Sequence, residues 1–232
     1  MLEELKKAVC EANLTLARSG LVAGTFGNVS GVDRPSGHMV IKPSGVPYEG
    51  MQPDQMVVVS LSDGSVAEGE LRPSSDTPTH LELYREFDEV GGVAHTHSTF
   101  ATAWAQARRR IEPLGTTHAD SFRGPIPVTR LLRSDEITGD YETNTGRVIV
   151  ERFAEIDPLE IRAVLVADHG PFTWGRTAGE AVKSAIALEQ VARLASETVR
   201  VEPYPVMMSR ELLDKHFLRK HGRDAYYGQK QP

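Results

Sequence analysis

Two histidines one residue apart, His95 and His97, follow an apolar run and are the first candidates for chemistry in this sequence. On an extended strand the side chains alternate between two faces, so residues two positions apart lie on the same face. Both imidazoles could therefore bind one metal ion, and imidazole is the commonest protein ligand for zinc and related metals. Two half-buried or surface histidines without any ligand would produce the same pattern, so this motif alone leaves both readings open.

A third histidine favours the metal reading. His169 follows the strongly apolar segment Ile161 to Ala167, which predicts a buried strand, and it precedes a glycine and a proline. Sites are commonly assembled at such strand ends. Two close histidines and a distant third are typical of a metal site that keeps a position open for substrate.

Three other segments have residues suited to an anion such as a phosphate monoester. The glycine-rich stretch from 21 to 32 offers backbone N–H groups, Asn28 and Ser30, although an ordinary strand and turn would look the same. Residues 42–45 combine the cation Lys42, the hydroxyl of Ser44 and Gly45 in a corner, where a plain Pro-Ser-Gly turn is the alternative.

The third segment precedes a predicted helix that is capped by Thr77 and has Pro78 as its first residue. Ser74, Ser75 and Asp76 would then lie at a helix N-terminus, which favours anions. Taken alone, Asp76 is more typical of a local capping carboxylate than of a ligand. His80, one turn further, is expected at the surface or in support of the ligands.

The elements that must position these residues can be read from periodicity and turn signals. Residues 148–153 could be a short strand or the start of a helix. The other predicted elements are a helix over 2–16, a strand over 38–41, a hairpin over 56–61 and 65–68, a helix from 77 to before Gly91, a strand that carries His95 and His97, a helix over 100–105, a strand over 161–167, a helix opened by a capping box at Thr177, and a charged helix over 211–221.

Composition limits the classes of function. The 232 residues are 40% hydrophobic and 25% charged, which predicts one globular domain over residues 1–232. A net charge of -6 gives no general attraction to nucleic acid or to anionic membranes, so neither is an expected partner. The single cysteine, Cys10, fits a reducing compartment, and no signal peptide or membrane span is recognisable, so we expect a cytoplasmic protein.

Two further candidates are less distinctive. Asp120 lies in a polar segment, 116–124, and could act as an acid or base, although each polar residue there is more typical of a structural role. Tyr226 and Tyr227 lie in an otherwise polar tail, which suggests docking against a neighbouring subunit.

Taken together, the motifs resemble those of the class II aldolase/epimerase family (the aldolase II/adducin-like family), and in particular its epimerases. The resemblance is carried, in order, by residues 27–30, 41–45, 74–80, 95–98, 117–120, 168–172 and the Tyr-Tyr-Gly tail at 226–228. It implies an α/β fold with a central, largely antiparallel sheet between helical layers. It also implies a cyclic homotetramer with active sites at subunit interfaces, where the tail from about 209 to 232 would pack.

The resemblance also assigns roles to individual residues. It makes His95, His97 and His169 ligands of one divalent metal per subunit, usually Zn2+ and alternatively Mn2+ or Co2+, with Asp76 as the associated carboxylate. It implies a substrate-phosphate site made by Asn28, Lys42, Ser44, Gly45, Ser74 and Ser75. Asp120 and Tyr227 match the proton-transfer pair, with Tyr227 coming from an adjacent subunit, and Thr116, Glu142 and His216 match supporting positions.

The implied activity is one that more than one pentose or ascorbate pathway could use. It is the interconversion of L-ribulose 5-phosphate and D-xylulose 5-phosphate at C4, by cleavage and re-formation of the C3–C4 bond. The main alternative is a class II aldolase of the fuculose- or rhamnulose-phosphate type, which releases its fragments. Those aldolases resemble this chain with Glu at position 76, so Asp76 and the tyrosine tail favour the epimerase. A non-enzymatic adducin-like module is the third alternative.

Overall fold

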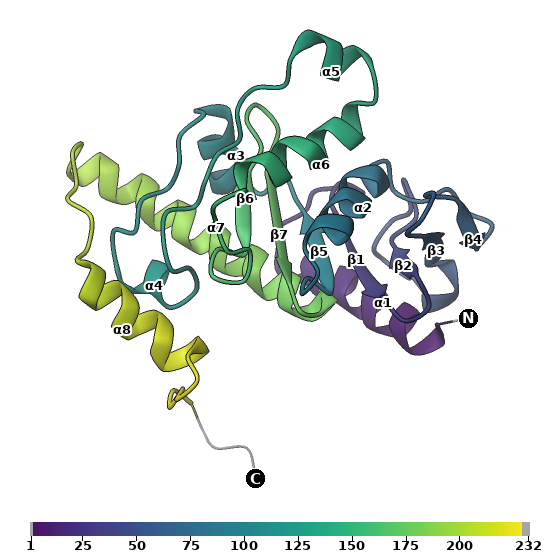
Figure 1. Cartoon of the computed structure of the whole chain (residues 1–232), viewed down its shortest axis with the longest axis horizontal. Coiled ribbons are helices and arrows are strands. Elements are labelled where there is room, and N and C mark those ends of the chain that lie inside the picture. Colours follow the sequence, from purple (N-terminus) through teal and green to yellow (C-terminus); the bar gives the residue numbers. More distant parts are fainter. Residues whose placement is uncertain (1, 229–232) are drawn as a thin grey trace.

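A seven-stranded antiparallel sheet forms the centre of the computed structural model, which describes residues 2–228 (Figure 1). In sheet order, the strands are β4 (Val66–Glu68), β3 (Val57–Ser60), β2 (His38–Ile41), β1 (Asn28–Asp33), β5 (Gly92–His95), β7 (Pro171–Gly175) and β6 (Ala163–Leu165). Every pairing between neighbouring strands is antiparallel. The strand that carries His95 therefore lies near the middle, between β1 and β7.

Helices pack on the sheet and extend beyond it (Figure 1). They are α1 (Glu3–Arg18), the 3-10 turn η1 (Pro53–Gln55), α2 (Thr77–Glu86), α3 (Thr99–Gln106), α4 (Thr116–Ala119), α5 (Ser134–Thr138), α6 (Tyr141–Arg152), α7 (Ala178–Val201) and α8 (Arg210–His221). None of the helices in the described part of the chain is both long and apolar enough to cross a membrane.

The alternation of side chains along the strands creates two hydrophobic cores. On β2, Met39 and Ile41 belong to the core that includes residues of α2, α3 and α6, whereas Val40 belongs to the core under α1 and the first half of α7. Full burial of one such side chain is worth about 1.5–3 kcal/mol, so both faces of the sheet must be covered. The predicted α/β fold with an antiparallel sheet between helical layers is confirmed.

Most predicted elements match the observed ones within a few residues. Residues 148–152, which the pattern left undecided, form the last turns of α6. Strand β5 ends at His95, so His97 lies in the connection to α3 rather than on the strand itself. Asp76, not Thr77, is the N-cap residue of α2. That the chain forms one domain over 1–232, with a tail from 209 to 232 at a subunit interface, stays a prediction, and residues 229–232 lie outside the described residues.

Gly92 at the start of β5 allows the sheet to approach α7 closely. A Cβ atom at this position would lie 2.3 Å from the backbone nitrogen of Ala178 and 2.4 Å from the carbonyl oxygen of Thr177. Such distances are far shorter than van der Waals contact, and backbone atoms cannot move aside as a flexible side chain can. A side chain here would push β5, and with it His95, away from its place in the sheet.

Candidate active site

The three predicted metal ligands come together at one end of the sheet. Ligand nitrogen atoms of His95, His97 and His169 all lie within 4.8 Å of one another. The Nε2 atoms of His95 and His97 are 3.0 Å apart. Two imidazole nitrogens on one tetrahedral zinc ion are separated by about 3.3 Å, given Zn–N bonds of about 2.0–2.1 Å. The spacing therefore fits one shared divalent ion.

The protonation of His95 also fits metal binding. Its Nδ1 atom lies 2.9 Å from the carbonyl oxygen of Pro171, which can only accept, so Nδ1 is the protonated nitrogen. Nε2 is then left with a free lone pair directed at the other imidazoles. The ring is also fixed by stacking on Phe172, with centroids 4.2 Å apart. Burial lowers the pKa of His95, and burial lowers the pKa of His169 to about 4, so both are neutral at pH 7.

A glycine permits the turn that carries His169 to reach the other two histidines. A Cβ atom on Gly170 would lie 2.8 Å from the carbonyl oxygen of Thr96, between His95 and His97. Any larger residue would force the two segments apart. The glycine after His169 is thus explained by a close backbone contact inside the site.

Asp76 lies beside the histidines and is held by Asn28. The Asn28 side-chain amide donates to Asp76 Oδ2 at 2.6 Å and to Ser74 Oγ at 3.0 Å. Burial tends to raise the pKa of Asp76, but the neighbouring imidazoles of His95 and His80 and the Asn28 hydrogen bond outweigh it and lower the pKa overall. Asp76 is therefore an anion next to the histidine cluster, although its oxygens do not belong to the group of described atoms within 4.8 Å.

The structure decides between the alternatives that the sequence left open for two neighbouring residues. His80 is fully buried rather than exposed, and burial lowers its pKa to about 3. Its Nδ1 atom and the hydroxyl of Tyr84 each lie 2.7 Å from Ser30 Oγ. Ser30 lies on the same face of β1 as Asn28 but two residues further along, where α2 covers it, so it belongs to a buried network under α2 and does not line the cleft.

A cleft of about 410 Å³ joins the histidine cluster to the predicted phosphate residues. Besides the three histidines and Asp76, it is lined by Asn28, Lys42, Ser44, Gly45, Ser74, Ser75 and Glu142, together with Thr25, Phe26, Gly27, Pro43 and Tyr141. The backbone of Glu142 is held at the cleft by a hydrogen bond of 2.6 Å, which its carbonyl oxygen accepts from the Thr79 hydroxyl. All the proposed metal and phosphate residues therefore surround one cavity.

Lys42 is the buried cation of this cleft. It is 1% exposed, and its ammonium group donates to the carbonyl oxygen of Val46 at 2.8 Å. The ring of Tyr48 lies 4.8 Å from the same nitrogen. Burial lowers the pKa of Lys42 to about 8, because no carboxylate compensates for the lost water. An anion bound at Ser44 and Gly45 would supply the missing negative charge.

The remaining predicted residues form a separate group at α4 and α8. Asp120 accepts hydrogen bonds from His216 at 2.9 Å and from Arg219 at 2.9 Å. Partial burial tends to raise the pKa of Asp120, but the hydrogen bonds from His216, Lys220 and Arg219 lower it overall. The ring of Tyr227 lies 4.3 Å from the Lys220 ammonium nitrogen.

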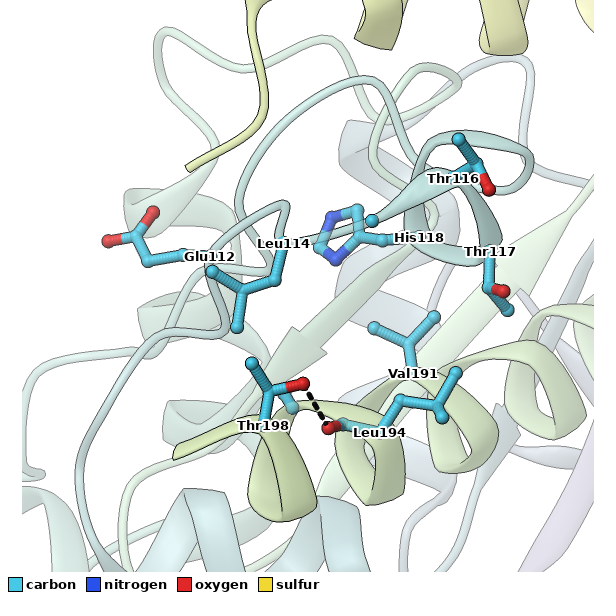
Figure 2. A pocket seen from close by; sticks show the side chains of 10 residues that line it. Glu112, Leu114, Thr116, Thr117, His118, Val191, Leu194 and Thr198 are labelled. Atoms are coloured by element: carbon cyan, nitrogen blue, oxygen red, sulfur yellow. Dashed lines mark hydrogen bonds between the residues drawn. The ribbon is translucent and has the colours of Figure 1, made fainter. Parts of the chain in front are cut away.

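Thr116 lies next to this group and lines a different pocket of about 300 Å³. Figure 2 shows that pocket, with Leu114 and His118 facing Val191, Leu194 and Thr198 of α7. Of the four residues Thr116, Asp120, His216 and Tyr227, none lines the histidine cleft of the described chain. The predicted site residues are therefore divided between two regions of the protein.

Two aromatic residues of the cleft were missed from sequence. The Tyr141 hydroxyl lies 3.5 Å from Nδ1 of His169. Phe26 is 68% exposed, and its ring stacks on His97 with centroids 6.4 Å apart. An aromatic residue beside closely spaced glycines was the available signal for Phe26, whereas a tyrosine at the start of a helix has no distinctive local pattern.

The chain matches known proteins along most of its length. The family model described as the class II aldolase and adducin N-terminal domain matches residues 7–196. A curated relative, the L-ribulose-5-phosphate 4-epimerase UlaF of Salmonella paratyphi B, is 54% identical over 229 residues, which cover 99% of this chain and 100% of the relative.

Solved structures show the same fold. A structure of L-fuculose 1-phosphate aldolase superposes with a TM-score of 0.77 and 25% identity, and the match covers 92% of this chain and 94% of the other. The structure of YgbL, a putative aldolase/epimerase/decarboxylase from Klebsiella pneumoniae, has a TM-score of 0.72 and 24% identity, with 93% and 99% coverage. From these matches and the arrangement of the cleft, we conclude that the chain belongs to the class II aldolase and adducin family and is an enzyme of its epimerase and aldolase branch.

Proposed function

We propose that the protein is a divalent-metal-dependent L-ribulose-5-phosphate 4-epimerase, which interconverts L-ribulose 5-phosphate and D-xylulose 5-phosphate. The main support is the single cleft that joins a three-histidine cluster to a set of phosphate-binding residue types. The relative that is 54% identical along the whole chain has this name. Zn2+ is the expected ion, because neutral imidazoles suit it, and Mn2+ or Co2+ would fit the same donors.

The chemistry explains why both halves of the cleft are needed. Carbon 4 of the substrate has no acidic hydrogen, so its inversion requires cleavage and re-formation of the C3–C4 bond. His95, His97 and His169 would hold a divalent ion, whose positive charge would stabilise the electron pair left on the ketose fragment. The other fragment keeps the phosphate, and the residues around it must hold that group while the aldehyde rotates to present its other face.

The phosphate-binding half is suited to this holding role. Ser44, Gly45 and Ser75 are exposed to the cleft, and Lys42 lies buried beside them as a cation. Ser74 and Ser75 precede α2, whose N-terminal N–H groups and dipole favour an anion. Retention of the phosphorylated fragment is what separates an epimerase from an aldolase.

Proton transfer to the C4 oxygen requires donors on both faces of the aldehyde, and Asp120 and Tyr227 are the proposed pair. Both lie in the separate region at α4 and α8, and neither lines the cleft of its own chain, so this proposal requires a neighbouring protomer to supply them. This arrangement supports a homotetramer with active sites between subunits, in which the tail from Ser209 onward packs against the neighbour. Thr116, Glu142 and His216 would support these groups. We place the enzyme in the cytoplasm, because a single cysteine fits a reducing compartment.

Product analysis tests the reaction directly. L-Ribulose 5-phosphate incubated with zinc-loaded protein should yield D-xylulose 5-phosphate, detected by chromatography or NMR, with no free fragments. Accumulation of free glycolaldehyde phosphate would instead favour the aldolase alternative, which the structural similarity to L-fuculose 1-phosphate aldolase makes the main rival. An unchanged substrate in the presence of bound zinc would contradict both.

Lys42 gives the phosphate site a specific pH dependence. Because burial lowers its pKa to about 8, the ammonium group of the free protein loses its proton as the pH rises through that value. Binding of inorganic phosphate, measured by calorimetry, should therefore weaken from pH 7 to pH 9.5. Lys42→Met should bind phosphate roughly 10- to 100-fold more weakly at pH 7 and lose this dependence, because a charged hydrogen bond is removed.

Lys7→Met provides the control for this measurement, since Lys7 is exposed on α1 and pairs only locally with Glu4. It removes the same charge without touching the cleft. Equal phosphate affinity in wild type and Lys42→Met would exclude Lys42 from the site.

A further inference from the structure

Helix α3 connects the two parts of the histidine cluster, which are far apart in sequence. It begins at Thr99, directly after the segment with His95 and His97. Its C-terminal end contacts the turn that carries His169, because the backbone N–H of Asp168 donates to the carbonyl oxygen of Ala105 at 3.2 Å. The position of α3 therefore relates the first two imidazoles to the third.

The contact between α3 and this turn is made by two residues with unusual backbone conformations. Arg108, just after α3, has a φ of 54°, and Asp168 has a φ of 62°. Among the described residues, the only other non-glycine with a positive φ is Leu2 near the start of the chain. Left-handed conformations are unfavourable for residues with a Cβ atom and persist only where the surroundings hold them.

Arg108 and Asp168 form a bidentate ion pair. Arg108 Nε donates to Asp168 Oδ1 at 2.8 Å, and Arg108 Nη2 donates to Asp168 Oδ2 at 2.9 Å. The parallel geometry fixes the orientation of both side chains as well as their separation. Arg108 therefore has a defined partner although it lies at an exposed helix end.

The opposite end of α3 is fixed as well. Glu189 on α7 accepts a hydrogen bond of 2.9 Å from the backbone N–H of Phe100 and another of 2.9 Å from that of Ala101. These N–H groups have no partner within the helix, and the carboxylate also complements the positive end of the helix dipole. Because both ends of α3 are held, the helix sets the distance between the His95–His97 segment and the turn that carries His169.

We propose that the Arg108–Asp168 ion pair is a positioning device for the metal site, which holds the left-handed turn before His169 so that this imidazole is preorganised to bind the ion. The inference rests on the proposed metal-dependent function. Neither residue lines the cleft, so each acts through His169 and not on the substrate. The side chains are 55% and 48% exposed, so the pair adds little to overall stability, and its effect is on the geometry of the turn.

The test compares Arg108→Ala with Arg110→Ala. Both variants remove one arginine from the same segment, but Arg110 pairs with Glu112 and does not contact the turn. Zinc affinity is measured on metal-free protein by competition with a chromophoric chelator, and the melting temperature of the metal-free protein is measured alongside. Arg108→Ala should bind zinc roughly 10-fold more weakly, the usual effect of losing a group that orients a ligand, with a nearly unchanged melting temperature. Arg110→Ala should match wild type in both measurements.

Asp168→Asn provides a second variant that is expected to fold, because asparagine tolerates the left-handed conformation. It should weaken zinc binding in the same direction, and the double variant Arg108→Ala/Asp168→Asn should lose no more than the larger single loss, since both changes break one ion pair. Additive losses would overturn the inference. So would wild-type zinc affinity in Arg108→Ala, or a loss of affinity matched by a general fall in melting temperature.

The outcome for His97→Ala separates this inference from the proposed function. If His97→Ala abolishes zinc binding while Arg108→Ala does not weaken it, the positioning role is wrong and the metal site stands. If His97→Ala also binds zinc as wild type does, the metal site itself is wrong.

Discussion

Replacing His97 by alanine is expected to remove bound metal and to lower epimerase turnover by about 10³-fold or more. His97 supplies one of three imidazole nitrogens that lie within 4.8 Å of one another, and two neutral ligands cannot replace three. The stabilisation of developing negative charge by a metal is worth several kcal/mol, and each 1.36 kcal/mol corresponds to a tenfold change in rate. Metal content by atomic spectroscopy and turnover of L-ribulose 5-phosphate should fall together.

This substitution should leave the fold intact. His97 is exposed and lies in the connection after β5, not in a core, so the melting temperature of the metal-free protein should change little. His38→Ala is the matched control, because His38 lies on β2 outside the cleft. It should keep both metal and activity. Full turnover by wild-type protein that has been stripped of metal and kept in excess chelator would contradict the metal mechanism.

Replacing Tyr227 by phenylalanine is expected to lower turnover by about 10²–10⁴-fold while metal content stays normal. The change removes only the hydroxyl. The ring can keep its positions 4.3 Å from the Lys220 ammonium nitrogen and 4.9 Å from the Arg219 guanidinium carbon. The backbone N–H of Tyr227 still donates to the carbonyl oxygen of Arg219 at 3.0 Å, so the tail should keep its conformation. The loss would therefore report proton transfer rather than misfolding.

The adjacent tyrosine provides the control. Tyr226 is 64% exposed, compared with 60% for Tyr227, and its ring also lies near a cation, 5.3 Å from the Lys215 ammonium nitrogen. Tyr226→Phe should keep wild-type turnover. Normal activity in both variants would show that the tail is not part of the active site. Loss of activity in Tyr226→Phe alone would show that Tyr226, and not Tyr227, is the proton-transfer residue.

The same variants test whether the active site is shared between protomers. Tyr227 lies at α8, away from the cleft of its own chain, so each site would take its histidines from one protomer and its tyrosine from another. Co-assembly of His97→Ala with Tyr227→Phe should then restore part of the activity, since some interfaces join an intact cleft to an intact tail. Mixed assemblies that stay inactive would contradict a shared site.

Local patterns in the sequence were sufficient for much of the fold. Turn signals around short apolar runs predicted β2 and the hairpin of β3 and β4, and the three- and four-residue spacing of apolar residues predicted α1. These rules act within a few residues of the chain. For the same reason they indicated the residue types of the site: paired imidazoles after an apolar run, a lysine beside Ser44 and Gly45, and serines before a helix.

The relative positions of segments far apart in the sequence depended on the tertiary structure, which local sequence rules do not describe. Antiparallel pairing places Asn28 opposite His95, and His95 opposite Phe172 just after the His169 turn, and these registers depend on the order of strands in the whole sheet. The packing of α2 on this face of the sheet covers Ser30, two residues beyond Asn28 on β1, and buries His80 against it.

By itself, the sequence determined which side chains could do chemistry and which local elements carry them. Only the tertiary structure decided that three histidines share one cavity with the phosphate residues, and that Asp120 and Tyr227 lie outside the cavity of their own chain. It also decided that Arg108 forms an ion pair with Asp168 in the turn before His169. The physical reason is that propensity, periodicity and capping are interactions between near neighbours in the chain. Sites are built from contacts between distant segments, which exist only once the sheet and its helices have packed.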